Sequence, residues 1–187
     1  MGEYSNMLHA ALNIGIDPIA IKEVVYQATA YLGIGRVHDY LLKTNEIMKE
    51  HGISLPLTSQ GTTDERTRFE KGLAKQAALF GLQMADRQKD TGLRKNINRW
   101  LASNCFGDYY TRNGLNDQER EMITFCFILA QGSCENQLRG HTAGNFGVGN
   151  DKEKMYQVVE QCMPYIGYPR SLNAMSVIDE VAMKFEK

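Results

Sequence analysis

The chain has 187 residues, 43% of them apolar and 23% charged, with a formal net charge of −1 at pH 7, which suits one domain or two small domains in close contact. Its positive and negative residues are interspersed rather than grouped, so we expect neither nucleic acid nor an anionic membrane as a partner. Since no apolar run approaches the ~20 residues of a membrane span and the first residues, MGEYSNMLHAAL, lack the basic and apolar regions of a secretion signal, we expect a cytoplasmic protein.

Helical periodicity dominates the first part of the chain, which predicts three helices. The first ends near Asn13, the second runs from Pro18 to Tyr31 with Asp17 as its N-cap, and the third runs from Arg36 to His51. Residues 53–63, ISLPLTSQGTT, then predict a linker by their Pro, Ser, Thr and Gly content. The linker separates a first segment, residues 1–52, from a larger domain, residues 64–187.

The rest of the chain is also helical in pattern, and no strand pair joined by a hairpin turn is visible. We expect helices from Thr62 or Thr63 to Phe80, from Leu93 to Cys105, from Asn116 through Ala130, from near Ser133, from Asn150 to Gly167, and from Pro169 to Phe185. Residues 81–92 have no clear assignment, and residues 106–114, FGDYYTRNG, predict a turn. The helix after Asn116 begins with a capping-box spacing to Glu119, and it is apolar on nearly all sides over residues 122–130, so it must be buried. The expected fold is all-α, built from helical hairpins around shared apolar faces.

Two segments of the sequence resemble each other. Residues 24–36, VVYQATAYLGIGR, and residues 158–170, VVEQCMPYIGYPR, share Val, Val, Gln, Tyr, Gly and Arg. Just upstream of each, His9, Ala11, Asn13 and Gly15 recur as His141, Ala143, Asn145 and Gly147. This pattern predicts two copies of one helical unit, of which the first is partial and has no Cys ahead of its His.

The second copy contains the residues that suit chemistry. On a helix that starts near Ser133, Cys134, Gln137 and His141 fall on one face, because steps of three and four residues return to the same side. Cys134 lies near the helix start, where free backbone N–H groups favour a thiolate. The imidazole of His141 suits an acid or base near neutral pH, and we expect the carboxylate of Glu121, on the preceding helix, to point at it. A lone Cys and a lone His on a helix are nevertheless more often packing or surface residues.

The four cysteines form no C-x-x-C pair and no Cys/His spacing typical of zinc, so we expect reduced thiols and no bound metal. Cys126 and Cys162 lie in apolar helical patterns and are interpreted as core residues, whereas Cys105 and Cys134 are not so easily assigned. No motif indicates haem, flavin or a nucleotide, and the single GVGN predicts a turn, so no cofactor is expected.

The stretch from Ile97 to Ile178 resembles the carboxymuconolactone decarboxylase family, which includes alkylhydroperoxidase D. The segments that carry the resemblance are FGDYYTRNGL, QEREMITFCFILAQGSCENQLRGH, NFGVGN and VVEQCMPYIGYPRSLNAM. It implies a helical fold of the alkylhydroperoxidase D type. It also implies homotrimers or homohexamers, in agreement with the apolar faces that a helical hairpin of this size leaves uncovered.

The resemblance transfers to individual residues in two ways. The alkylhydroperoxidase branch uses a C-x-x-C-x-x-x-H helix, in which Cys134 and His141 match the first Cys and the His, but Gln137 replaces the second Cys, so the dithiol cycle cannot run in that form. Glu121 lies one residue further upstream than this pattern expects. The decarboxylase branch resembles a lactone-processing site of His, Glu and Arg, which Arg120, Glu121, His141 and Arg170 fit in type.

Three hypotheses follow. In the first, the protein is a lyase that acts on a small carboxylated lactone or related acid, with Arg120 or Arg170 holding a carboxylate, His141 moving a proton, Glu121 orienting His141, and Gln137 in the substrate site. In the second, Cys134 performs thiol redox chemistry, with Cys105 or an external thiol as the resolving sulfur. In the third, the protein is a non-catalytic assembly or ligand-binding module, since the first copy has kept the scaffold without the reactive residues.

Overall fold

The computed structural model describes residues 1–185, and within them the chain is all-helical with no strand, as predicted. The elements in chain order are α1 (Gly2–Asn13), α2 (Pro18–Leu32), α3 (Ile34–Glu50), α4 (Arg68–Phe80), the 3₁₀-helix η1 (Leu82–Lys89), α5 (Lys95–Trp100), the π-helix η2 (Leu101–Tyr110), α6 (Asp117–Gln131), α7 (Glu135–Gly147), α8 (Lys152–Ile166) and α9 (Tyr168–Phe185). None of the helices in this part of the chain has both the length and the hydrophobicity needed to cross a membrane.

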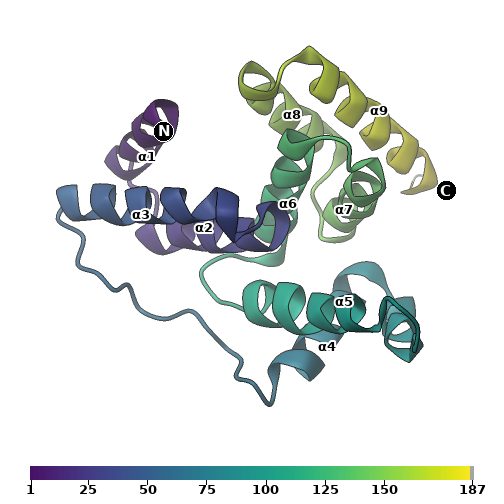
Figure 1. Cartoon of the computed structure of the whole chain (residues 1–187). Coiled ribbons are helices and arrows are strands. Elements are labelled where there is room, and N and C mark those ends of the chain that lie inside the picture. Colours follow the sequence, from purple (N-terminus) through teal and green to yellow (C-terminus); the bar gives the residue numbers. More distant parts are fainter. Residues whose placement is uncertain (186–187) are drawn as a thin grey trace.

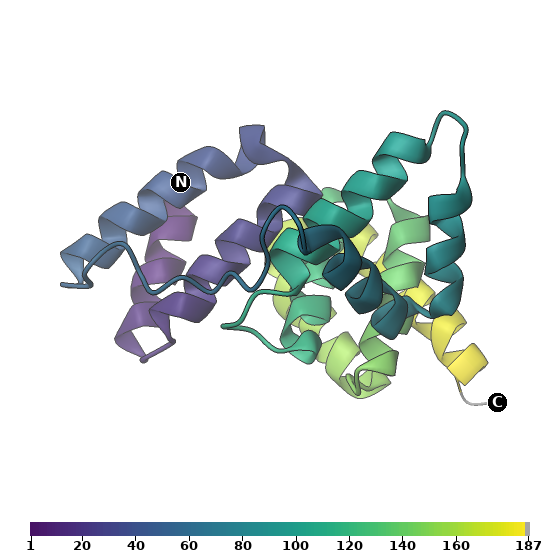
Figure 2. The ribbon, with the colours of Figure 1, turned by 90° about the horizontal axis from the view of Figure 1, so that it is seen from below.

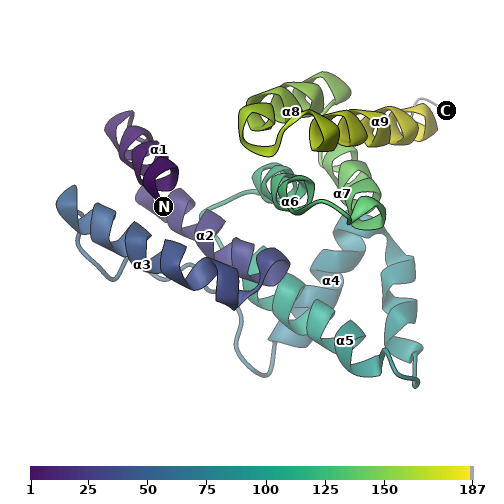
Figure 3. The same ribbon diagram turned by 45° about the horizontal axis from the view of Figure 1, so that its top comes forward.

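The helices form three groups around α6 (Figure 1). The first group is α1 to α3, the second is α4 to η2, and the third is α7 to α9, which packs on α6. Helix α2 contacts both α6 and η2, so it joins the first group to the other two, and Figure 3 shows α6 between them. The linker from α3 to α4 runs across the α2–α3 pair (Figure 2).

The predicted caps of α2 and α6 are confirmed. Asp17 accepts a hydrogen bond from the Ile19 amide at 2.8 Å and begins α2. Asn116 and Glu119 form the predicted capping box at the start of α6, with N···O distances of 2.9 and 2.7 Å. The partners of these hydrogen bonds are two or three residues apart, which is why their spacing alone was sufficient.

Two predictions around α4 were wrong. Thr62 and Thr63 do not cap this helix, because their hydroxyls donate instead to the backbone carbonyls of Thr111 and Gly107, at 2.7 and 2.9 Å. The helix begins later, at Arg68. Residues 106–110 are not a turn but the end of η2, which packs closely on α4. That packing requires glycine, since a Cβ on Gly72 would lie 1.9 Å from the carbonyl oxygen of Ala102.

The start of α8, in the third group, also differs from the prediction. Asp151, not Asn150, caps α8, and it accepts from the Lys154 amide at 2.8 Å. Asn150 is buried and donates to the backbone carbonyl of Gln118 and the side-chain oxygen of Asn145, at 2.9 and 2.8 Å. Asn150 therefore ties the loop before α8 to α6 and α7 rather than starting a helix.

The main core lies between α6, α7, α8 and α9. Its largest fully buried apolar side chains are Phe125, Met155, Val159 and Ile178. Phe125, Ile128 and Leu129 of α6 are buried as expected, but Ala130 is exposed at the end of the helix. The first group has a smaller core of Val25, Ala28 and Val37, and Cys105, Phe106 and Tyr110 form a third cluster. That third cluster borders the candidate site.

Candidate functional site

A cavity of about 850 Å³ opens between η2, the end of α4, and the start of α7. Cys134, Gln137 and His141 all line it, so the structure brings these three predicted residues together. Tyr31, from the end of α2, lines the cavity as well, so the first group of helices contributes to its wall. We call this space the His141 cavity. Its volume lies within the usual range for small-molecule sites.

His141 and Glu121 form a hydrogen-bonded pair in the cavity wall. His141 Nδ1 lies 2.9 Å from Glu121 Oε2, and the Glu121 side chain is completely buried while that of His141 is 12% exposed. An ionised carboxylate only accepts hydrogen bonds, so Nδ1 carries the proton and donates it. The other ring nitrogen, Nε2, is therefore the one that can exchange a proton with a molecule in the cavity.

Glu121 is held from two sides. The Tyr110 hydroxyl donates to Oε1 of Glu121 at 2.8 Å, and the Asn145 side chain donates to the Glu121 backbone carbonyl at 3.0 Å. Burial raises the pKa of Tyr110 well above its usual value, so this phenol stays protonated and remains a donor. The carboxylate thus has fixed partners on both oxygens, which fixes the orientation of the His141 ring.

Glycine at position 144 lets α7 approach Glu121. A Cβ at Gly144 would lie 2.3 Å from Glu121 Oε2 and 2.9 Å from a ring carbon of Phe80. The ring of Phe80 and that of Tyr31 meet His141 edge to face, with centroids 5.2 and 5.6 Å from the imidazole. The imidazole is therefore enclosed by aromatic rings on either side and by Glu121 at Nδ1.

Cys134 lies at the N-cap of α7, just before the first helical residue, Glu135. Its side chain makes no capping hydrogen bond, and the Gln131 side-chain amide donates to its sulfur at 3.2 Å. The preceding residue, Ser133, has a φ of 57°, so a strained turn presents Cys134 to the cavity. The sulfur is therefore held by the turn and by Gln131 rather than by the first turn of the helix.

Cys105 lines the same cavity, but its thiol is poorly reactive. Its thiol is buried and donates to the hydroxyl of Tyr31 at 3.6 Å. Burial raises the pKa of Cys105 to about 12, so the thiolate needed to attack a sulfenic acid on Cys134 is scarce at neutral pH. Cys105 is therefore a poor resolving thiol for Cys134.

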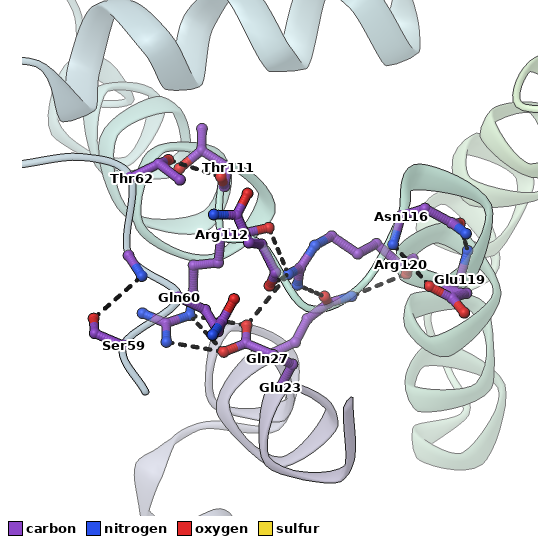
Figure 4. A network of polar contacts seen from close by, with 12 residues as sticks. Glu23, Gln27, Ser59, Gln60, Thr62, Thr111, Arg112, Asn116, Glu119 and Arg120 are labelled. Atoms are coloured by element: carbon purple, nitrogen blue, oxygen red, sulfur yellow. Dashed lines mark hydrogen bonds and ion pairs between the residues drawn. The ribbon is translucent and has the colours of Figure 1, made fainter. Parts of the chain in front are cut away.

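Arg120 does not reach the His141 cavity, contrary to the substrate-binding role expected for it. Its side chain is completely buried and faces α2, where it donates to Glu23 at 3.2 Å and to Gln27 at 2.8 Å (Figure 4). It also donates to the backbone carbonyls of Arg112 and Asn113. The sequence did not indicate this contact, because the two side-chain partners of Arg120, Glu23 and Gln27, lie more than 90 positions away.

Arg170 also lies outside the His141 cavity. It is exposed at the start of α9 and donates to the Ala130 carbonyl at 2.5 Å. It lines a separate cavity of about 170 Å³, which Cys134 borders from the other side. The structure thus groups Cys134, Gln137 and His141 at one cavity with Glu121 bonded to His141, whereas Arg120 does not line this cavity and Arg170 shares only the smaller cavity with Cys134.

Two residues of the cavity were not predicted. Gln76 of α4 is 2% exposed, and its side-chain oxygen has no hydrogen-bond partner within the described residues. The available sequence signal was that the polar Gln76 lies on the same face of α4 as the apolar Leu73 and Phe80. Arg87 of η1 supplies a cation at the cavity. It lies in the segment that had no assignment, and no sequence signal indicated it.

Two comparisons with known proteins bear on this site. Residues 96–180 match the model of the carboxymuconolactone decarboxylase family. The chain is also similar to the 4-carboxymuconolactone decarboxylase of Acinetobacter baylyi (strain ATCC 33305 / BD413 / ADP1), with 25% identity over 120 residues that cover 63% of this chain and 89% of that protein. The family match includes Glu121, Cys134 and His141, but neither Gln76 nor Arg87.

Proposed function

We propose that the protein is a decarboxylase-like lyase that acts on a small carboxylated lactone or a related acid by acid–base chemistry. The observation that carries this proposal is the hydrogen bond between the buried carboxylate of Glu121 and His141, which lines the His141 cavity. The match of residues 96–180 to the carboxymuconolactone decarboxylase family and the similarity to a 4-carboxymuconolactone decarboxylase support the class of reaction.

The proposed role of His141 follows from the balance of the reaction. Loss of CO₂ breaks a carbon–carbon bond and leaves the electron pair on the lactone, which must then take up one proton. His141 donates this proton from Nε2, and Glu121, at Nδ1, keeps the ring oriented and stabilises its charged form. Glu121 acts through His141, so it is a positioning residue.

The substrate carboxylate needs a cation, and Arg87 replaces Arg120 and Arg170 in this role. Arg87 is the arginine that lines the His141 cavity within the described part of the chain. A guanidinium suits a carboxylate because its planar donors match the two oxygens. Gln76 and Gln137 add side-chain amides to the wall of the same cavity.

The test uses 4-carboxymuconolactone and measures the release of CO₂. We expect His141→Ala to lower kcat by about 10²-fold or more, and Arg87→Gln to raise KM with a smaller effect on kcat. His38→Ala is the matched control, because His38 is an exposed histidine of α3 that does not line the His141 cavity. Turnover by His141→Ala at the rate of the unmodified protein would falsify the lyase assignment.

A thiol redox activity at Cys134 is the second candidate. It is supported by the position of the Cys134 sulfur in the same cavity as His141 and by the hydrogen bond from Gln131. In this reaction a hydroperoxide oxidises Cys134 to the sulfenic acid and is reduced to an alcohol, and two equivalents of an external thiol then return the cysteine. An external thiol is required because Cys105 is a poor resolving thiol.

Peroxide consumption in the presence of dithiothreitol tests this candidate. We expect Cys134→Ser to abolish it and Cys162→Ser to leave it unchanged if the activity exists. Absence of consumption by the unmodified protein excludes the redox function. Absence of both activities would favour the non-catalytic module.

We also propose that the chain self-associates. Tyr165, Tyr168 and Leu172 are exposed at the corner between α8 and α9, which forms an apolar surface. A trimer or hexamer would cover it, and light scattering after size exclusion measures this mass directly. A monomer at all concentrations would rule out self-association.

A further inference from the structure

A second cavity lies at the other end of α2 from the His141 cavity. It has a volume of about 590 Å³ and is lined by the first half of α2, the end of α3 and the linker. Figure 2 shows how the linker crosses these helices. The two cavities share no lining residue: Lys22 and Tyr26 of α2 face this one, whereas Ala30 and Tyr31 face the other. We call it the linker cavity. Nothing in the proposed lyase reaction uses it.

The linker cavity has an excess of positive charge. It is lined by the cations Lys22, Lys49 and Arg112 and by one carboxylate, Glu23. Glu23 is already neutralised, because Arg112 donates three hydrogen bonds to it at 2.9–3.0 Å and Arg120 donates a fourth at 3.2 Å (Figure 4). Glu23 therefore does not act as the counterion of Lys22 or Lys49.

Lys22 is the unusual residue of the cavity. It is 6% exposed, and its ammonium donates to the neutral side chain of Asn45 rather than to a carboxylate. A buried ammonium without a counterion is costly, and the burial lowers the pKa of Lys22. Within the described residues, neither Lys22 nor Lys49 has an ion-pair partner. The protein thus holds two cations at one cavity and supplies no anion for them.

The remaining wall has a polar part, made by Asn45, Thr58, Ser59 and Gln60, and an apolar part. Ile19 and Tyr26 of α2 and Leu55, Pro56 and Leu57 of the linker form the apolar part. A ligand that fits must therefore carry a negative charge at one end and an apolar body at the other. A volume of this size accommodates a small aromatic or branched acid.

We propose that the linker cavity binds a small organic carboxylate, with its carboxylate on Lys22, its charge shared by Lys49, and its apolar body against Tyr26 and the leucines of the linker. An anion there supplies the counterion that Lys22 lacks and displaces water from the apolar wall. The ligand also bridges α2 and the linker, so its binding holds residues 55–60 against the helices.

The experiment titrates the ¹⁵N-labelled full chain with benzoate and follows the backbone amide signals. We expect saturable shifts for residues 55–60 and for the first half of α2. Benzamide, which has the same shape without the charge, and inorganic phosphate, which has charge without an apolar body, should each bind at least about tenfold more weakly. Equal binding of benzamide or phosphate, or no saturable shift with benzoate, overturns the proposal.

Two variants locate the carboxylate. Lys22→Met keeps the apolar stem and removes the charge, and should weaken benzoate binding by at least about tenfold, while Lys49→Gln should weaken it by a few-fold. Lys154→Met removes an exposed charge on α8 and is the matched control, expected to leave binding unchanged. Circular dichroism checks that Lys22→Met is folded, and Lys49→Gln provides the test if it is not. Unchanged benzoate binding in both Lys22→Met and Lys49→Gln overturns the proposal.

Discussion

Replacing Arg120 by Met should destabilise the fold rather than remove a substrate contact. The change leaves Glu23 with its Arg112 partner, but the side-chain oxygen of Gln27 and the carbonyls of Arg112 and Asn113 each lose a donor. A buried polar group without a partner costs about 1–3 kcal/mol. Removal of the buried guanidinium and its unpaired Nε offsets part of this cost. The expected loss in the free energy of unfolding is about 3–5 kcal/mol, or roughly 10 °C in Tm for a chain of this length.

Thermal and urea unfolding, followed by circular dichroism, measure this loss. Arg139→Met is the matched control, since Arg139 pairs with Glu180 at 2.7 Å but both side chains are about 40% exposed, and we expect little change in its midpoint. A Tm for Arg120→Met within about 2 °C of the unmodified protein would show that Arg120 does not organise the contact between α2 and α6. Such a result would favour a ligand-binding role for Arg120.

Two further predictions concern the His141 cavity and the thiols. Gly144→Ala should displace Glu121 from His141, because the new methyl group would lie 2.3 Å from Glu121 Oε2. We expect kcat on 4-carboxymuconolactone to fall at least about tenfold. Gly147→Ala is the control and should leave kcat unchanged, because a Cβ there meets nothing within 4 Å. Brief treatment with iodoacetamide should label Cys162 well before Cys105, because the Cys126 thiol 3.9 Å away lowers the pKa of Cys162 to about 7, whereas burial raises that of Cys105 to about 12. Peptide mass spectrometry should show labelling of Cys162 rising with pH up to about 8 and then levelling, and faster labelling of Cys105 would contradict the assignment.

The parts of the fold that follow from short-range chemistry were predictable from the sequence. The all-α class, the N-cap Asp17 and the Asn116–Glu119 capping box depend on residues within one or two turns of each other. The sequence predicts a turn at the end of η2, whereas the helical conformation there depends on α4, which approaches through Gly72. Sequence spacing does not record such a tertiary contact.

The site residues were likewise predictable where they are close together in the sequence. His141 and Cys134 share a helix segment, so their common face followed from helical periodicity, and the expected contact between Glu121 and His141 is present at 2.9 Å. Arg120 precedes Glu121 directly, and consecutive residues on a helix point about 100° apart, so Arg120 faces α2 instead of the cavity. Gln76 comes from another group of helices, and its place in the wall depends on how α4 packs.

The two-copy hypothesis raises the question of whether residues 64–187 fold without the first copy. Helices α1 to α3 and α7 to α9 have the same order, a short helix followed by a hairpin whose corner is a glycine of positive φ, Gly33 or Gly167. Descent of the two segments from one unit remains a proposal. If residues 64–187 were a complete domain, they would fold without the first copy, but Arg120 takes two of its partners from α2, and Tyr31 of the same helix closes the His141 cavity.

We therefore expect residues 64–187 alone to lose cooperative unfolding, because the face of α6 that holds Arg120 would be exposed to water. Cleavage of the full chain at a protease site inserted beside the exposed Ser59 should, in contrast, leave the two pieces bound to each other, since the contacts between α2 and α6 do not depend on the linker. Urea unfolding of the short fragment and size exclusion of the cleaved protein measure the two effects. A fragment that unfolds cooperatively at the midpoint of the full chain would show that the second unit is independent, and that the first is an appendage rather than a wall of the site.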